Sequence, residues 1–387
     1  MNQISLYNKS TDSKLSIEAE ELTSSRNIKI PKDGSFLLTN KTRLTEELAD
    51  KYTVGPTGDF QELEEAVRVI CNMKEYSSRQ RDVIVELQEN YLFKTYTQFG
   101  MNAGFIVVRP KSPMTLNNAE LYRGFDSGVF IVAHGAISPR FENFTMNITS
   151  TGVRLFDVIK HSTLTFHSCT FNFDYQDKQD AVMWFPLFLH YDSTTLNMTN
   201  TVINMSINKN NNTLLHNGQS LYRWLSVCGE NTNTLISNVK ITIEDKSNIN
   251  DSSITTVFPT GIQSRGIFSG SESLISYSAE HGGFVIIHTH SNGCLTLGDG
   301  LTITANSSSG YENQISTLID AYNFGSITCQ NIKLQDCGTN SKPIGYSFKV
   351  NAGSKISITN YQSANSHVTN ETNIAVNTLT NSGVIYK

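Results

Sequence analysis

Residues 327–334 read Ile-Thr-Cys-Gln-Asn-Ile-Lys-Leu, so that apolar side chains alternate with polar ones on both sides of Asn331. Alternation with a period of two is typical of a β-strand that has one face in a core. Two such strands can contribute to the same core only if the chain bends sharply at the residue between them. Asn and Asp tolerate the left-handed backbone of such a bend better than other non-glycine residues. The segment therefore predicts a strand, a one-residue bend and a second strand.

The same pattern recurs along the chain, with its bend position at Asn118, Asn143, Ser168, Asn200, Asn238, Asp299, Asn331 and Asn360. The intervals run from 25 to 38 residues, apart from one of 61 residues that predicts two turns, with a degenerate turn near Ile275. Helical-hairpin repeats keep a nearly fixed length, whereas a β-solenoid keeps its strands and varies its loops. We therefore predict an all-β protein, a right-handed parallel β-helix in which the amides of stacked bend residues form a ladder.

The amino-acid composition agrees with a solenoid whose outer surface is polar but largely uncharged. Ser, Thr and Asn number 119 of 387 residues, and Ser and Thr suit the outward positions of a pleated strand. A hydrophobic fraction of 38% with a net charge of -5 excludes a disordered chain, and the excess of acidic over basic residues argues against nucleic-acid binding. The longest apolar run, residues 181–189, is too short to span a membrane, and no secretion signal is expected at the N-terminus.

The first 50 residues differ from the repeats and contain a hairpin signal. Residues 26–40 read RNIKIPKDGSFLLTN, which is strand, Pro-x-Asp-Gly turn and strand. This string resembles a short element near the N-termini of bacteriophage tail-fibre and tail-spike proteins. It departs from their pattern at Phe36, which follows Ser35 where Thr is commoner.

Residues 51–103 are predicted to cap the solenoid, because a terminal coil exposes apolar core and unpaired strand edges. Asp59 is placed as the N-cap of an amphipathic helix, with apolar residues at helical spacing at Phe60, Leu63, Ala66, Val67 and Ile70. A strand is expected over residues 82–87. The stretch TVGPTGDFQELEEA resembles the opening segment of pectate-lyase-like phage fibre and spike proteins. With the repeats, the resemblance spans about residues 26–375.

This resemblance implies a virion structural protein, a tail-fibre or tail-spike-like subunit that binds a host-cell surface glycan. Residues 1–50 would attach it to tail or baseplate proteins, residues 51–103 would cap it, and residues 104–387 would form the shaft with a short C-terminal tail. The resemblance also implies a homotrimer, assembled in the bacterial cytoplasm and located in the virion. Two alternatives stay open: a spike that degrades polysaccharide as a hydrolase or lyase, and a structural connector or decoration protein without a receptor.

Catalytic candidates are the carboxylates of the repeat region, since polysaccharide-cleaving sites use paired carboxylates. They are Asp174, Asp177, Asp180, Glu244 and Asp245, and Asp299 with Asp320 is another pair that can face one groove. None lies in a recognisable motif, so solvated loop carboxylates are the favoured interpretation.

Candidate glycan-binding residues are aromatic side chains among polar neighbours, because aromatic faces stack on sugar rings. They are Tyr191, Tyr222, Trp224, Tyr277, Tyr311 and Tyr322. The alternative is that they are half-buried at the corners of the solenoid or at a subunit interface.

No cofactor and no metal site is predicted. His281, His288 and His290 lie close together, and on a strand His288 and His290 share one face, but no acidic residue lies within residues 281–290. A stacked surface ladder or a ladder between chains is preferred to a metal site. The six cysteines have no zinc spacing and are expected to be buried thiols.

Overall fold

The computed structural model describes residues 2–8, 13–19, 48–74, 82–89, 91, 97–111, 115–118, 128–132, 135–150, 154–158, 160–176, 188–190, 193–208, 226–228, 232–246, 260–262, 266–279, 284–289, 293–298, 300–307 and 316–387. These residues form one α-helix and 33 β-strands. Contacts divide the chain into a smaller unit, Met1–Leu48 with Asn72–Arg79, and a larger unit, Ala49–Cys71 with Gln80–Lys387.

The described part of the smaller unit is an antiparallel hairpin of β1 (Asn2–Asn8) and β2 (Ser13–Ala19). The strands pair over their full length, from Asn2 opposite Ala19 to Asn8 opposite Ser13. Sequence reasoning did not predict this hairpin, although alternating apolar residues at positions 4, 6, 15 and 17 are a strand signal. The hairpin that was predicted over residues 26–39 lies outside the described residues.

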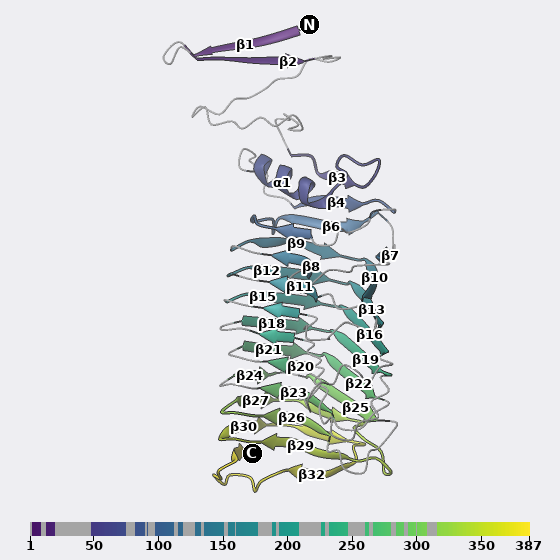
Figure 1. Cartoon of the computed structure of the whole chain (residues 1–387), viewed down its shortest axis with the longest axis vertical. Coiled ribbons are helices and arrows are strands. Elements are labelled where there is room, and N and C mark those ends of the chain that lie inside the picture. Colours follow the sequence, from purple (N-terminus) through teal and green to yellow (C-terminus); the bar gives the residue numbers. More distant parts are fainter. Residues whose placement is uncertain are drawn as a thin grey trace. The chain divides into compact units, whose positions relative to one another are not determined.

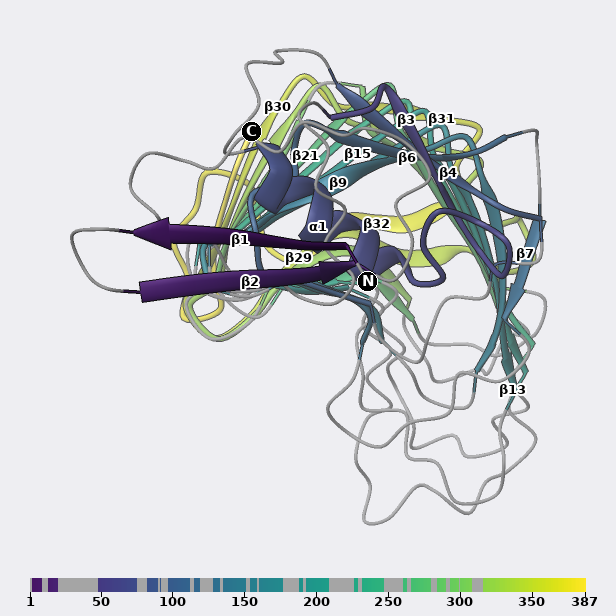
Figure 2. The ribbon, with the colours of Figure 1, turned by 90° about the horizontal axis from the view of Figure 1, so that it is seen from above.

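Parallel strands of the larger unit stack into three faces, which the chain visits in turn (Figures 1 and 2). Face 1 consists of β3 (Lys51–Val54), β4 (Val83–Leu87), β6 (Ile106–Pro110), β9 (Ile137–Glu142), β12 (Thr163–His167), β15 (Thr195–Thr199), β18 (Thr232–Ser237), β21 (Gly266–Ser271), β24 (Cys294–Leu297), β27 (Ser326–Gln330), β30 (Ser354–Thr359) and β33 (Gly383–Tyr386). Face 2 consists of β7 (Thr115–Asn118), β10 (Thr145–Ser150), β13 (Thr170–Gln176), β16 (Val202–Asn208), β19 (Lys240–Asp245), β22 (Leu274–Ala279), β25 (Thr302–Ser307), β28 (Lys333–Gln335) and β31 (Gln362–Ala364). Face 3 consists of β5 (Thr97–Phe99), β8 (Gly128–Val132), β11 (Arg154–Val158), β14 (Phe188–His190), β17 (Ser226–Cys228), β20 (Thr260–Ile262), β23 (Val285–Thr289), β26 (Thr317–Ala321), β29 (Ile344–Val350) and β32 (Val368–Thr372).

From β6 onward, each strand lies beside the strand that comes three positions later in the chain. We call three consecutive strands, one from each face, a rung. Strand pairing within each face is parallel and in register over most positions, for example throughout β13 and β16. The stacked parallel sheets confirm the prediction of an all-β, solenoid-like fold. The degenerate turn predicted near Ile275 is also present, because β22 pairs with β19 before it and β25 after it.

The core follows from the period-two pattern of the strands. In β12, Leu164 and Phe166 are buried, while Thr163, Thr165 and His167 are only partly covered. Aromatic rings continue from rung to rung inside the larger unit: the ring centroid of Phe141 lies 5.8 Å from that of Phe99 and 5.2 Å from that of Phe166. Burial of such side chains provides most of the stabilisation, about 1.5–3 kcal/mol for each large apolar side chain.

The corner between face 1 and face 2 is a one-residue bend with left-handed backbone. The residues there with φ between 49° and 57° include Asn143, Ser168, Asn200, Asn238, Asn331 and Asn360, all at predicted bend positions. Adjacent bends are joined by hydrogen bonds along the stack, and Asn238 Nδ2 donates to Asn200 Oδ1 at 2.9 Å.

Two bend assignments differ from the prediction. Asn118 lies in β7, where it pairs with Ile148 of β10, so its assignment as a bend residue was wrong. Apolar residues alternate with polar ones inside a single strand as well as on both sides of a bend. The pattern therefore could not distinguish Asn118 from a bend residue. Asp299 lies outside the described residues, and the neighbouring Gly300 has a φ of 81° and donates its N–H to Asn331. The degenerate turn bends at Glu272, with a φ of 50°.

The helix α1 (Leu63–Lys74) precedes β4, and its apolar side is buried. Leu63, Ala66, Val67 and Ile70 are buried, as their spacing predicted. The helix begins four residues after the predicted N-cap. Asp59 instead accepts hydrogen bonds from the backbone N–H and the hydroxyl of Thr53, each at 2.9 Å, and thereby closes the turn before the helix.

At the other end of the stack, side chains close the last described rung. The amide of Asn373 follows β32 and pairs with both backbone groups of Val350 in β29, at 2.9 Å and 2.8 Å. Lys387 lies 2.5 Å from Glu371 and over the ring of Tyr361, and the Tyr361 hydroxyl donates to Glu371. These contacts tie the C-terminal residues to β31 and β32.

Candidate functional site

The outer surface of face 2 carries a ladder of asparagine amides. Asn147, Asn172 and Asn204 occupy equivalent outward positions of β10, β13 and β16. Asn172 Nδ2 donates to Asn147 Oδ1 at 2.8 Å, and Asn204 Nδ2 donates to Asn172 Oδ1 at 2.9 Å. The strands place these amides in one row, because outward side chains of parallel strands in register stack directly above one another.

A cavity of about 350 Å³ opens beside this ladder. It is lined by Asn147, Asn172, Phe173, Asp174, Asn204, Met205, Ser206, Thr242 and Glu244. Phe173 and Met205 are largely buried and give it an apolar floor, while the other side chains are polar. Asp174 and Glu244 lie in one row with Ser206 between them, so their backbones are roughly 10 Å apart.

Two further cavities follow along the same edge of face 2. One of about 320 Å³ shares Glu244 with the first cavity, and one of about 600 Å³ shares Asn306 with the second. The second is lined by Glu244, Asp245, Lys246, Ser278, Ala279, Asn306 and Ser307, and the third by Asn306, Asp336, Gly338, Thr339, Asn340, Ser341, Asn365 and His367. We call the residues that line the three cavities the trench. It runs along the stack from β10 to beyond β31.

The trench is acidic. The exposed carboxylate of Glu244 forms an ion pair with Lys246 at 3.2 Å. Lys246 is the one lysine among the residues that line the trench, so the charge of that lysine is already paired. Asp245 differs from its neighbour, because its side chain is turned inward and is buried, and Tyr277 Oη donates to it at 3.2 Å.

Asp245 and Tyr277 therefore do not form the exposed candidate sites that the sequence suggested. Alternation along β19 turns Asp245 to the side opposite to Glu244, and Tyr277 lies in the core with 1% of its surface exposed. A tyrosine between two serines has the sequence context of an outward residue. In β22, however, alternate side chains point inward, and Tyr277 is one of them.

Of the other candidates, the structure brings Asp174 and Glu244 to one cavity. Tyr322 is exposed, but it lies after β26 at the end of face 3 and not in the trench. The remaining candidates lie outside the described residues: Asp177, Asp180, Tyr191, Tyr222, Trp224 and Tyr311.

His288 is buried in β23 and does not form a surface ladder. Its Nδ1 lies 2.9 Å from Asp320 Oδ2 in β26, and Asn351 Nδ2 donates to the same carboxylate at 3.4 Å. Asp320 is thus held by a histidine on the preceding strand of face 3, whereas Asp299, His281 and His290 lie outside the described residues. No cluster of three potential metal ligands occurs in the part of the chain that the structure describes.

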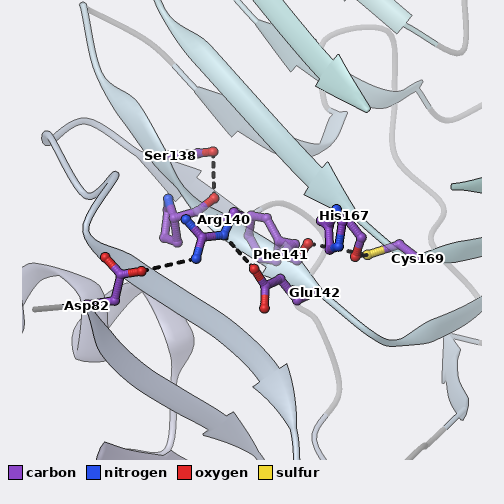
Figure 3. Close-up of polar contacts among 8 residues, drawn as sticks. Asp82, Ser138, Arg140, Phe141, Glu142, His167 and Cys169 are labelled. Carbon is purple, nitrogen blue, oxygen red and sulfur yellow. Dashed lines mark hydrogen bonds and ion pairs between the residues drawn. The ribbon is translucent and has the colours of Figure 1, made fainter. Parts of the chain in front are cut away.

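A second polar network lies on the outer surface of face 1 (Figure 3). Arg140 donates to Glu142 at 2.5 Å and to Asp82 at 3.1 Å, and these hydrogen bonds raise the pKa of the Arg140 guanidinium. None of the cavities described above touches this network. Because Asp82 directly precedes β4, the network ties β9 to an earlier rung, and we interpret it as structural.

The described cysteines contribute no reactive thiol in the core. Burial raises the pKa of Cys169 and Cys329 to about 12 and that of Cys337 to about 11. A buried thiol with a raised pKa is a poor nucleophile at neutral pH. Free thiols are found, as expected from the spacing, at Cys71, Cys169, Cys294, Cys329 and Cys337. Cys294 is exposed, so the expectation that every cysteine is buried was wrong there.

Sequence reasoning missed the residues that form the ladder. Their signal is an Asn between two apolar residues, repeated at intervals of 25 and 32 residues as Asn147, Asn172 and Asn204. This signal can be recognised only when the strand register is known. Because the loop lengths differ, the bend positions alone do not define that register.

Comparison with known proteins identifies no relative: no protein-family model and no curated sequence matches the chain. Within the described residues, no helix has the length and apolarity required to cross a lipid bilayer.

Proposed function

We propose that the chain is a glycan-binding shaft protein, and that its polysaccharide ligand lies lengthwise in the trench. The observation that carries this proposal is the continuity of the three cavities along the stack. Their walls consist largely of amides, hydroxyls and carboxylates, which match sugar hydroxyls because these both donate and accept hydrogen bonds. An extended polymer can contact many rungs at once, so that weak contacts add up.

The wider biological role that we propose is that of a tail-fibre or tail-spike-like subunit of a phage or phage-derived particle. The stacked parallel sheets support a right-handed parallel β-helix, and the resemblance of residues 26–40 and 53–66 supports the phage origin. In this proposal residues 1–50 attach the protein to the tail, the shaft forms a homotrimer, and the ligand is a host surface polysaccharide.

The binding function is tested by removing the amide ladder. Replacing both Asn172 and Asn204 with Ala is expected to weaken binding to whole bacteria or purified surface polysaccharide by tenfold or more, since each lost hydrogen bond contributes about 0.5–1.5 kcal/mol. The matched control is Asn197→Ala, which removes an outward amide from β15 on face 1. Binding is measured by biolayer interferometry on immobilised polysaccharide.

Two results would contradict the proposal. If the double variant binds as tightly as Asn197→Ala, the trench is not the binding surface. If the unchanged protein binds no bacterial polysaccharide, the connector or decoration role becomes the better hypothesis.

The presence of two carboxylates in one cavity favours a second candidate function, cleavage of the bound polymer. In a hydrolase, one carboxylic acid would protonate the leaving glycosidic oxygen, while the other carboxylate takes a proton from the attacking water. Asp174 and Glu244, two strands apart, leave room for that water. Release of new reducing ends that disappears in Asp174→Asn and Glu244→Gln, but persists in Glu272→Gln at an exposed bend, would establish hydrolysis.

A further inference from the structure

The amide ladder of face 2 ends beside an unpaired hydroxyl group. Thr242 of β19 follows Asn204 in the same row. Its Oγ1 is buried and has no hydrogen-bond partner among the residues that the structure describes. Leaving a buried polar atom unpaired destabilises a fold. Because Thr242 lines the cavity, a turn of its side chain about χ1 would present this hydroxyl to a ligand there.

Asn204 supplies the complementary acceptor. Its Nδ2 is used by Asn172, and within the described residues its Oδ1 accepts no hydrogen bond. Asn204 and Thr242 lie side by side on adjacent strands without a hydrogen bond between them, so one ligand hydroxyl can bond to both. That hydroxyl would donate to Asn204 Oδ1 and accept from Thr242 Oγ1.

Charge around this position restricts the ligand. Asp174 and Glu244 line the same cavity, and both accept hydrogen bonds from hydroxyls but repel anions. Lys246 is paired with Glu244, and Lys240, two residues before Thr242 on the same side of β19, is not among the residues that line this cavity. A carboxylate, phosphate or sulfate on the polymer would therefore meet two carboxylates and no cation among the residues that line this cavity.

We propose that Asn204 and Thr242 form a subsite for one sugar unit that presents hydroxyl groups and carries no anionic group. This inference rests on the proposed glycan binding and makes it more specific. The subsite selects neutral or amino-bearing polysaccharides and disfavours acidic ones. Phe173 and Met205 at the cavity floor offer an apolar surface for the face of the sugar ring.

The test measures affinity and stability of the same variants. Surface polysaccharides purified from a panel of bacteria are sorted by composition into neutral, amino-bearing and acidic polymers, and binding of the full chain is measured to each. Thr242→Val is expected to lower the affinity for the bound polymers about three- to tenfold, the loss of one hydrogen bond. Its melting temperature should stay the same or rise, because the variant removes an unpaired buried hydroxyl without removing a protein contact.

Two variants complete the design. Thr242→Ser keeps the hydroxyl and should retain the affinity. Thr304→Val makes the same change two strands further along the row, at a residue that lines none of the three cavities, and should leave affinity unchanged. Loss of affinity with unchanged stability would support the subsite, because a merely structural threonine would lose stability first.

The outcomes separate this inference from the proposed function. Unchanged affinity of Thr242→Val, or binding confined to acidic polymers, would overturn the subsite. The proposed function would survive that result if the Asn172 and Asn204 double variant still lost binding. Binding of the unchanged protein to none of the polymers would overturn both.

Discussion

At the scale of the residue, the corner between face 1 and face 2 depends on side chains that tolerate a positive φ. Asparagine occupies most of these positions, but Ser168 and Glu272 adopt φ of 52° and 50° without its conformational preference. The left-handed region costs ordinary residues about 1–2 kcal/mol, and asparagine less. The corner is therefore locally strained at these two rungs and relaxed at the asparagine rungs.

We expect Ser168→Asn to stabilise the protein by about 0.5–1 kcal/mol, because asparagine lowers the cost of the positive φ. The new amide would also stand between Asn143 and Asn200, which bend on the neighbouring rungs. Urea denaturation measures the change. The control Ser168→Ala should be destabilised, and an equal stability of both variants would show that backbone strain does not govern this corner.

At the scale of the element, the last strands are closed by side chains instead of by another strand. Glu371 in β32 is central to this closure. Partial burial by itself raises the pKa of Glu371, but hydrogen bonds from Lys387 and Tyr361 outweigh it, and the pKa of the carboxyl is lowered. A lowered pKa in the folded state means that the ionised group adds stability above its ordinary pKa and that this contribution disappears as the pH falls.

Glu371→Gln is accordingly expected to lower the melting temperature at pH 7. The difference from the unchanged protein should narrow as the pH falls below the ordinary carboxyl pKa of about 4.3 and vanish near pH 2. Circular dichroism melts from pH 2 to pH 8 provide the measurement. The exposed bend residue Glu272, changed to Gln, serves as control, and a pH-independent difference would mean that Glu371 acts through packing alone.

At the scale of the whole molecule, the sequence predicted the stacking of parallel strands and most corners, because both depend on local pattern. Alternation and a tolerant bend residue are encoded within eight residues, as in 327–334. The trench was not predicted as a unit, because Asp174, Glu244 and Asn306 come to lie in one row only through strand register across long connections. The alternation of side chains along a strand decides which acidic residues reach the trench surface. Glu244 and Asp245 are adjacent in sequence but point to opposite sides of β19.

The proposed trimer makes a prediction about mass. Three chains of 43.0 kDa give 3 × 43.0 = 129 kDa, and light scattering coupled to size exclusion should report this value for the purified protein. A mass of 43 kDa at micromolar concentration would contradict the trimer and leave the trench proposal intact. Binding by a monomer would then rest on one trench instead of three, with correspondingly lower avidity.

The direction of the hydrogen bonds between rungs has a mechanical consequence. They run along the stack, so tension between its ends loads the bonds between successive rungs directly. The weakest boundary would open first, and each released rung would add its own length of chain. A 32-residue rung, such as that between Ser168 and Asn200, would add roughly 110 Å. Because rungs differ in length, force spectroscopy should record unequal steps, and the stack would yield gradually under load instead of opening at once.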